Sequence, residues 1–510
     1  MPDTTKHLRR AAKTLRRAFS DGDAQALARV HAVLPGATTL RHADALHVIA
    51  REAGHDSWPK LKFAEEARAQ DRATRAATLA DALFHGRAWQ VEALLSETPD
   101  LGRDTLALAC ATYDVAEITR RLARDPAAAT RAVNDRRPIA ALAFSRYHQC
   151  GGTEADMLTT AEALLAAGAD VDDSIPAGDG SDHRLSVLYG AIGHANNMAL
   201  AEWLLDHGAD PNDNESLYHA TELGHRGGVR LLLAHSARPE GTNALLRALD
   251  FDDREAVALL LAAGADPAEP PAGHPSGEPP VVTGALHQAA RRMCSGATAQ
   301  LLLDHGADPS ARFFGHTAYA LARIHGNTPV AEAIAAHGGD TALTGPEAQL
   351  ARAADGTQGA RDWIDMETLS PESRRLLCRM SGRPGALPHM KRLVDMGFDA
   401  NAADEMGLTP LMLAGWEGEP EVFAFFLGQG PDLGHVNRYG GGLLETILHG
   451  SLNCPQRAAR DHIACMEQAL HQGVSLPRRL LAVPADAELA DFLSDWAERH
   501  PGQLVDDPAA

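Results

Sequence analysis

Short apolar stretches at helical spacing recur along most of the chain, and each stretch ends at a glycine. Leucine doublets or triplets precede the glycines, as in Leu164-Leu165 and Leu301-Leu302-Leu303. Such leucines pack a helix against its neighbour, and glycine ends the helix because a left-handed residue costs it little. Ala-Asp follows the glycine in four copies, at Gly168, Gly208, Gly264 and Gly306. In three weaker copies a different residue stands between the glycine and the Asp, at Gly338, Gly397 and Gly430. The Asp begins a turn.

A second short helix is expected about twenty residues before each of these glycines. Val187 to Ile192 and Leu286 to Ala290 have the required apolar pattern. Two short antiparallel helices and a turn make a unit that cannot bury its apolar face alone. Units of this kind must therefore stack into an extended array.

The spacing of the turn glycines is irregular. It is 40 residues from Gly168 to Gly208, 42 from Gly264 to Gly306, and 32 from Gly306 to Gly338. Ser236 stands at the glycine position between Gly208 and Gly264 and divides that interval into 28 and 28. Longer intervals indicate loops inserted between units.

One segment carries a family pattern. Residues 404–414 read DEMGLTPLMLA, and residues 285–289 (ALHQA) and 315–319 (GHTAY) are partial copies. These segments resemble the hairpin and Thr-Pro-Leu helix start of the ankyrin repeat, whose period is about 33 residues. The resemblance implies an all-α ankyrin-repeat solenoid of about 12 helix-turn-helix units over residues 73–480. It also implies a non-enzymatic scaffold or adaptor that binds a partner protein in a concave groove.

The flanks differ from the array. Residues 1–72 are predicted to be helical, and 43–52 with 57–61 are similar to a segment that precedes the repeats in bacterial ankyrin-repeat proteins. We expect residues 1–72 to form an N-terminal cap and 481–510 a C-terminal capping helix and tail, because end units need a polar outer face. Residues 267–283 contain six prolines and are predicted to be a loop inserted between two repeats.

Charge is distributed unevenly along the chain. The net charge is −21, and residues 1–75 carry 14 Lys and Arg against 9 Asp and Glu, which leaves −26 on the remainder. An acidic body repels phosphate backbones, so nucleic acid is not an expected partner of the whole chain. The first helix has a basic side that extends from Arg9 to Arg17. An alternative function is therefore that this helix binds nucleic acid or an anionic membrane surface.

Composition adds further expectations. Lysine occurs only five times and arginine supplies the other basic residues, which is typical of a GC-rich, bacterial genome. Six scattered cysteines without a CxxC pair indicate reduced thiols and a cytoplasmic location. No apolar run reaches the length of a membrane span. We expect a monomer.

The sequence contains no pattern of catalytic or cofactor chemistry. Cys454 and Cys465 lie near histidines, but their spacing matches no zinc finger. Gly151-Gly152 lacks the strand-to-helix context of a phosphate loop, and there is no EF-hand. We therefore predict no catalytic residue, no metal and no cofactor. The alternative is a regulatory or catalytic subunit whose chemistry lies in residues 1–72 or 341–400.

Candidate partner-binding residues follow from aligning the repeats. In the ankyrin family, the two places before the turn that ends the first helix face the groove, and aromatic side chains are over-represented there in this chain. Aromatic residues and arginine dominate the energetic centres of protein interfaces. The predicted binding residues are Phe251, Arg291, Arg292, Phe313, Phe314, Trp416 and Glu417.

Overall fold

The computed structural model describes residues 5–178, 180, 182–269, 284–359, 362–481 and 487–506. The chain divides into two compact units, Met1–Asp308 and Pro309–Ala510. This boundary falls inside the predicted repeat array. The insertion predicted at 267–283 lies outside the described residues from position 270 onward, and the three predicted domain ranges stay predictions.

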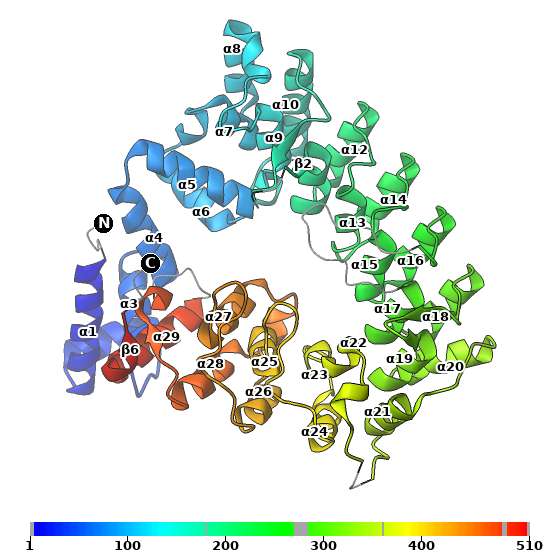
Figure 1. Cartoon of the computed structure of the whole chain (residues 1–510). Coiled ribbons are helices and arrows are strands. Elements are labelled where there is room, and N and C mark those ends of the chain that lie inside the picture. Colours follow the sequence, from blue (N-terminus) through cyan, green and yellow to red (C-terminus); the bar gives the residue numbers. More distant parts are fainter. Residues whose placement is uncertain are drawn as a thin grey trace. The chain divides into compact units, whose positions relative to one another are not determined.

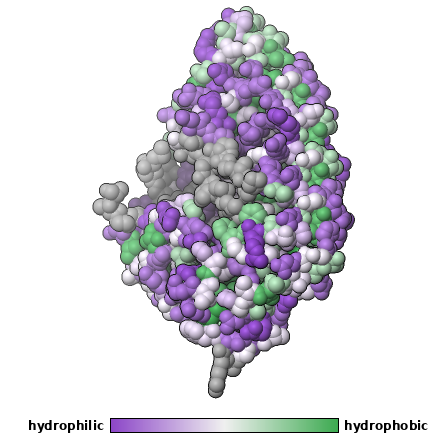
Figure 2. Space-filling model, turned by 45° about the vertical axis from the view of Figure 1, so that its right-hand side comes forward, coloured by the Kyte–Doolittle hydropathy of each residue, from purple (hydrophilic) through white to green (hydrophobic). Residues whose placement is uncertain are grey.

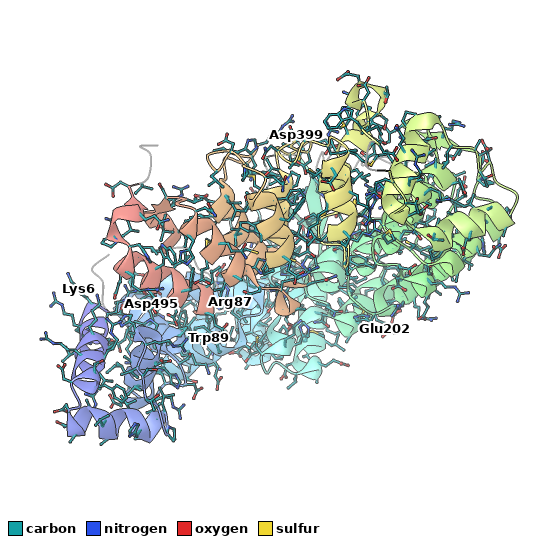
Figure 3. The ribbon with its side chains drawn as sticks, turned by 90° about the horizontal axis from the view of Figure 1, so that it is seen from below. Lys6, Arg87, Trp89, Glu202, Asp399 and Asp495 are labelled. Carbon is teal, nitrogen blue, oxygen red and sulfur yellow. The ribbon has the colours of Figure 1, made fainter. Side chains whose placement is uncertain are left out.

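The first unit begins with four helices that have a core of their own. Their bounds are α1 Lys6–Ser20, α2 Ala24–Val33, α3 His42–Glu52 and α4 Trp58–Ala69. Helix α1 packs on α2 and α3, and Leu15 and Phe19 are buried on that side. Its basic side is exposed, and side chains around α1, including the labelled Lys6, point away from the neighbouring helices (Figure 3). The helical prediction for this region is confirmed; its role as a cap stays a prediction.

The rest of the first unit consists of helix pairs that follow one another from α5 to α18 (Figure 1). The first helices of the pairs are α5 Arg72–His85, α7 Leu106–Ala111, α9 Pro138–Ala143, α11 Val187–Tyr189 with the π-helical turn η4 Gly190–His194, α13 Ser216–Ala220, α15 Ala244–Asp250 and α17 Ala285–Arg291. The second helices are α6 Ala88–Glu97, α8 Val115–Arg124, α10 Glu154–Ala166, α12 Met198–Asp206, α14 Gly227–Ala234, α16 Arg254–Ala262 and α18 Gly296–Asp304. The shorter elements are η1 Leu101–Arg103, η2 Pro126–Ala129, η3 Tyr147–Gln149 and an antiparallel pair of strands, β1 Ser174–Pro176 and β2 Arg184–Ser186.

These pairs stack in two layers. Each first helix contacts the next first helix from α5 to α17, and the second helices do the same from α8 to α18. Leu164, Leu204 and Leu302 of the second helices are fully buried between the layers. The stacking predicted from the leucine pattern is therefore present within this unit.

Polar caps fix where the helices begin. Thr105 and Ser186 precede first helices, and each hydroxyl accepts a hydrogen bond from the backbone N–H three residues later, over 3.1 Å and 2.8 Å. Asp114 and Asp253 do the same for the second helices α8 and α16. These bonds satisfy N–H groups that have no partner inside the helix.

The predicted glycine ends are confirmed. Gly168, Gly208, Gly264 and Gly306 have φ between 92° and 97°. After each, the alanine N–H donates to the carbonyl five residues earlier over 3.0 Å, as from Ala209 to Leu204, which closes the helix end. Ser236 adopts the same left-handed conformation with φ of 67°.

The second unit is also mainly helical. Its longer helices are α19 Ala318–His325, α20 Thr328–Ala336, α21 Gly345–Asp355, α24 Leu387–Asp395, α25 Pro410–Glu417, α26 Pro420–Leu427, α27 Leu443–Asn453, α28 His462–His471 and α29 Ala487–Arg499. The short elements are β3 Arg312–Phe313, β4 His316–Thr317, η5 Met366–Thr368, α22 Pro371–Arg374, α23 Leu376–Arg379, η6 Arg457–Ala459, β5 Leu476–Pro477, η7 Arg478–Leu481, η8 Pro501–Gln503 and β6 Leu504–Val505. Strands β3 and β4 form an antiparallel hairpin, and β5 pairs with β6 in parallel.

Candidate functional site

A row of aromatic rings runs along the first helices of the first unit. It consists of Phe84, Phe144, Tyr189, Tyr218 and Phe251, which come from α5, α9, α11, α13 and α15 or the residue directly after them, and we call it the aromatic row. The rings of Phe84 and Phe144 are nearly parallel with centroids 6.0 Å apart, and the Phe144 and Tyr189 centroids are 6.1 Å apart. These contacts connect α5, α9 and α11, although the repeat of α7 and α8 lies between the first two in the sequence.

Two histidines fill the spaces in this row. The ring of His194 lies 4.1 Å from Phe84 and 5.4 Å from Phe144. The ring of His219 lies 4.9 Å from Tyr189 and 5.0 Å from Tyr218. Burial and the nearby guanidinium of Arg146 lower the pKa of His194 to about 4, so this imidazole is neutral at pH 7.

His219 has the opposite electrostatic environment. Its Nδ1 lies 2.8 Å from Glu222 Oε2 and its Nε2 lies 3.1 Å from Glu215 Oε2. Burial alone would lower the pKa of His219, but the hydrogen bonds to the two carboxylates outweigh it and raise the pKa to about 9. The imidazole is therefore protonated at pH 7 and donates to both glutamates.

Arg247 supports the end of the row. Its guanidinium carbon lies 5.6 Å from the Tyr218 ring centroid and 4.9 Å from that of Phe251. Its Nε donates to Glu222 over 2.7 Å and its Nη1 donates to Asp250 over 2.8 Å. Phe251 is 47% exposed, so a large apolar ring is presented to solvent on a cation that two carboxylates hold in place.

The structure places three predicted residues close to this end of the row. Phe251 follows α15, and Arg292 of the next repeat donates from Nε to Asp250 over 2.8 Å. Arg291 donates from Nε to its helix neighbour Gln288 over 2.7 Å. The exposed Phe251 and Arg292 are therefore connected through Asp250.

The other four predicted residues belong to the second unit. Phe314 is 50% exposed with φ of 50° at the tip of the β3–β4 hairpin, and Phe313 is half-buried on β3. Trp416 is half-buried, and its carbonyl oxygen accepts a hydrogen bond from His462 Nε2 over 2.9 Å.

Glu417 lies 3.5 Å from Cys454 Sγ, and burial raises the pKa of its carboxyl. Trp416 and Glu417 thus contact the following repeat as well as solvent.

Three residues in or beside the row, Arg247, Tyr218 and His219, were not predicted from the sequence. Arg247 stands one helical turn before Phe251, which is the spacing at which a cation can lie against the ring. Tyr218 and His219 lie in the repeat that ends at Ser236 instead of a glycine, and they were not among the predicted binding residues. The signal available was the spacing of aromatic and basic residues along one helix face.

In the same alignment, the two places before the turn are Phe144 with Ser145 in one repeat and Ile324 with His325 in another. Phe144, Ser145, Ile324 and His325 are all buried. Those places therefore pack between repeats, and only part of the aligned set is accessible to a partner.

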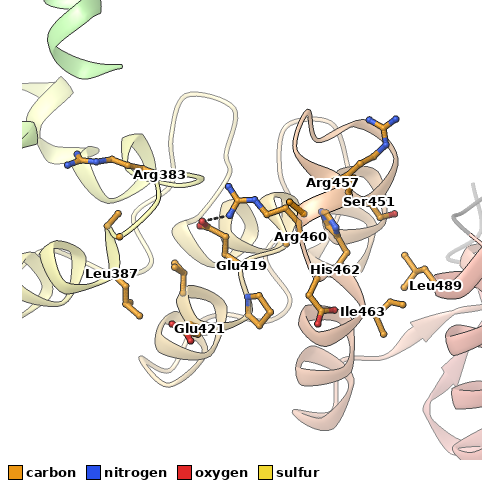
Figure 4. A pocket seen from close by; sticks show the side chains of 18 of the residues that line it. Arg383, Leu387, Glu419, Glu421, Ser451, Arg457, Arg460, His462, Ile463 and Leu489 are labelled. Atoms are coloured by element: carbon orange, nitrogen blue, oxygen red, sulfur yellow. Dashed lines mark hydrogen bonds and ion pairs between the residues drawn. The ribbon is translucent and has the colours of Figure 1, made fainter. Parts of the chain in front are cut away.

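The second unit contains a separate cavity of about 1350 Å³ (Figure 4). It opens beside the N-terminal ends of α24, α26 and α28, and Leu489 of α29 lines it as well. Arg460 crosses it and donates from Nη1 to Glu419 over 2.6 Å. Arg383 donates to the carbonyl oxygen of His325 over 2.5 Å. Its arginines are therefore largely engaged within the protein.

Within the described part of the chain, no group of three or more His, Cys, Asp or Glu side chains is arranged to hold a metal ion. All six cysteines are unpaired, and Cys454 and Cys465 are buried. None of the helices in the described ranges is long and apolar enough to cross a membrane. On the face shown in Figure 2, the coloured residues form small hydrophobic groups among hydrophilic ones.

Comparison with known proteins identifies the middle of the first unit. Residues 188–270 match the family model "Ankyrin repeats (3 copies)". These residues are ankyrin repeats. Tyr189, His194, His219, Arg247 and Phe251 all lie within them.

The crystal structure of the human ASB11 ankyrin repeat domain is similar to the chain with a TM-score of 0.35 and 21% sequence identity. The similarity covers 47% of this chain and 100% of the ASB11 domain. No match was found among curated proteins.

Proposed function

We propose that this protein is a non-enzymatic scaffold or adaptor that binds a partner protein on the concave face of its repeats. Ankyrin repeats generally mediate protein–protein interaction, and residues 188–270 are such repeats. The observation that carries the proposal is the exposed Phe251 ring held on Arg247. An exposed ring on a fixed cation gives a partner apolar area that is already ordered, so little conformational entropy is lost on binding.

The proposed binding surface has two parts. Phe251, Arg291 and Arg292, together with the accessible members of the aromatic row, form the part on the first unit. Phe313 and Phe314 at the hairpin tip, with Trp416 and Glu417, form the part on the second. Phe251 and Phe314 are the energetic centres, because large rings that become buried on binding contribute most.

Affinity capture tests this function. The intact protein and a Phe251→Ala variant are used as bait in a lysate of the source organism, and the captured proteins are identified by mass spectrometry. Tyr439→Ala is the matched control, because this ring is 73% exposed and lies outside the proposed surface. A protein held by the intact chain and the control but lost by Phe251→Ala supports the proposal. A protein held equally by all three contradicts the assignment of the surface.

A second candidate function is electrostatic binding through α1. Arg9, Arg10 and Arg17 are exposed. Arg17 forms an ion pair with the exposed Asp21 over 3.9 Å. The apolar side of α1 is buried against α3, so this helix would bind an anionic membrane surface or nucleic acid by charge rather than by insertion. Steep loss of binding with salt, abolished by deleting residues 1–20, would favour this function.

We propose that about 12 repeats extend over residues 73–480, capped by 1–72 and 481–510, in a cytoplasmic, bacterial monomer. The confirmed repeats at 188–270 and the repeated helix ends on either side of them support this extension.

A further inference from the structure

Arg146 is a half-buried cation without a carboxylate partner. It follows α9 in the first unit, and its Nη2 donates to the carbonyl oxygen of His194 over 2.5 Å. Its Nε is buried and makes no hydrogen bond in the described part of the chain. The described residues provide it with no ion pair either.

Several other arginines of the first unit are neutralised by carboxylates. Arg247 bonds Glu222 and Asp250, and Arg226 donates to Asp253 over 2.8 Å. Arg146 differs from them because no carboxylate compensates for the burial of its guanidinium. Burial lowers the pKa of its guanidinium, which is the direction expected for a desolvated cation.

The surroundings of Arg146 are cationic and aromatic. The guanidinium carbon of Arg136 lies 5.7 Å from the Phe84 ring centroid, and Arg136 forms no ion pair among the described residues. Burial and then the charge of Arg146 lower the pKa of His148 and of His194, so both rings stand in its positive field. The charge of Arg146 also acts on the hydroxyl of Tyr189.

Asp81 lies on α5, whose Leu83 carbonyl accepts from the Arg146 backbone N–H, and Glu222 acts on Tyr189; both carboxylates are already paired. Asp81 of α5 accepts from Arg87 Nη1 over 2.5 Å and lies 3.1 Å from His85 Nδ1. Glu222 is engaged by His219 and Arg247. The anion that would neutralise Arg146 is therefore not supplied by these side chains.

A half-buried, unpaired guanidinium is costly to the free protein and gains greatly from an added anion. A carboxylate meets a guanidinium through forked, charge-assisted bonds, which are about twice as strong as neutral ones. The charge of −26 on the chain after residue 75 repels an acidic partner from most of this part and makes an unpaired cation within it a selective point of attraction.

We propose that Arg146, with Arg136, Phe84 and Tyr189 around it, binds an Asp or Glu side chain of a partner's peptide segment. This inference rests on the proposed function, because the acidic side chain belongs to the partner protein that is proposed to bind at the aromatic row. The carboxylate bonds Arg146, and the neighbouring residue of the segment packs against the rings.

Selection from a random dodecapeptide display library tests the proposal. The baits are the intact protein, Arg146→Met, and Arg131→Met as a matched control, since Arg131 forms an exposed ion pair with Asp125. We expect the intact protein and the control to select peptides with Asp or Glu at a recurrent position. A synthetic peptide with the consensus sequence should bind Arg146→Met about 10- to 100-fold more weakly than it binds the intact protein. The intact protein should lose a similar factor in affinity when the acidic residue of the peptide is changed to its amide.

Folding of the variant is measured separately by thermal unfolding. Arg146→Met should unfold no earlier than the intact protein, because it removes a desolvated charge together with one hydrogen bond. If it is unstable, Arg146→Lys retains the charge without the fork and should lose part of the affinity.

The outcomes separate this proposal from the proposed function. Neutral peptides whose binding survives Arg146→Met but is lost in Phe251→Ala would overturn the acidic site and leave the binding face intact. Acidic peptides that bind Arg146→Met as well as the intact protein would also overturn it. Failure to select any peptide would overturn binding of a linear acidic segment.

Discussion

The imidazole Nε2 of His194 donates a hydrogen bond to the carbonyl oxygen of Phe84, 110 residues earlier, over 2.8 Å. The His194 ring also lies 4.1 Å from the Phe84 ring. This pair fixes the C-terminal end of α5 to the turn η4, whose sequence lies within the ankyrin repeats. The aromatic row is therefore held together by a bond between distant parts of the first unit.

Replacing His194 should destabilise the first unit. His194→Ala removes both the hydrogen bond and the ring packing, and we expect a loss of about 2 kcal/mol in the free energy of unfolding. Urea unfolding followed by circular dichroism measures it. His305→Ala is the control, because His305 is exposed and its ring bonds a carbonyl oxygen of its own helix. Equal losses in the two variants would contradict the role given to His194.

The same histidine makes stability depend on pH. Its pKa is about 4 in the folded protein, below the ordinary value of 6.5, so on acidification the unfolded chain binds the proton first. The stabilisation is present above pH 6.5 and is lost as pH falls towards 4, with an upper limit of about 3 kcal/mol. His194→Gln keeps a donor for Phe84 but does not titrate, so its unfolding free energy should fall less over this range. Parallel curves for the two proteins would refute this.

Ser236 offers a stabilising substitution. It occupies the left-handed helix end with φ of 67°, where glycine stands in four neighbouring copies. Ser236→Gly should raise the free energy of unfolding by about 1 kcal/mol, because a left-handed conformation costs a non-glycine residue about that much. Ser295→Gly is the control and should destabilise, since Ser295 has φ of −70° and caps α18. A lower melting temperature for Ser236→Gly would count against the assigned conformation.

The division of the chain predicts an independently folding fragment. Residues 1–308 form a compact unit that includes the aromatic row. A protein ending at Asp308 should therefore unfold cooperatively and retain a helical circular dichroism spectrum. A shorter fragment that ends at Ala262, the last residue of α16, lacks α17. It exposes the apolar face of α15 that packs on α17 and should be less stable than residues 1–308. A fragment 1–308 that is unfolded in buffer would contradict the division.

The sequence was sufficient for the local structure. Leucine doublets and glycines predicted the helix ends, because those depend on residues a few positions apart, and Ser236 was placed correctly by spacing alone. The helix expected within residues 481–510 is observed as Ala487–Arg499.

The packing between repeats was harder to predict. His325 and Phe251 occupy equivalent places in the aligned repeats, yet His325 is buried and Phe251 is half exposed. That difference depends on how the next repeat packs, which spacing does not encode. The bonds of Arg247 to Glu222 and Asp250, and the isolation of Arg146, arise from the same stacking and were not visible in the sequence.

The most direct test of the proposed function is the dissociation constant of a purified captured partner for three proteins. These are the intact chain, Phe251→Ala and Tyr439→Ala, each first shown to have the same unfolding midpoint. The account predicts at least a ~30-fold weaker complex for Phe251→Ala, which corresponds to the loss of about 2 kcal/mol at an interface centre, and no change for Tyr439→Ala. Equal affinities for the intact chain and Phe251→Ala would show that the aromatic row is not the binding surface.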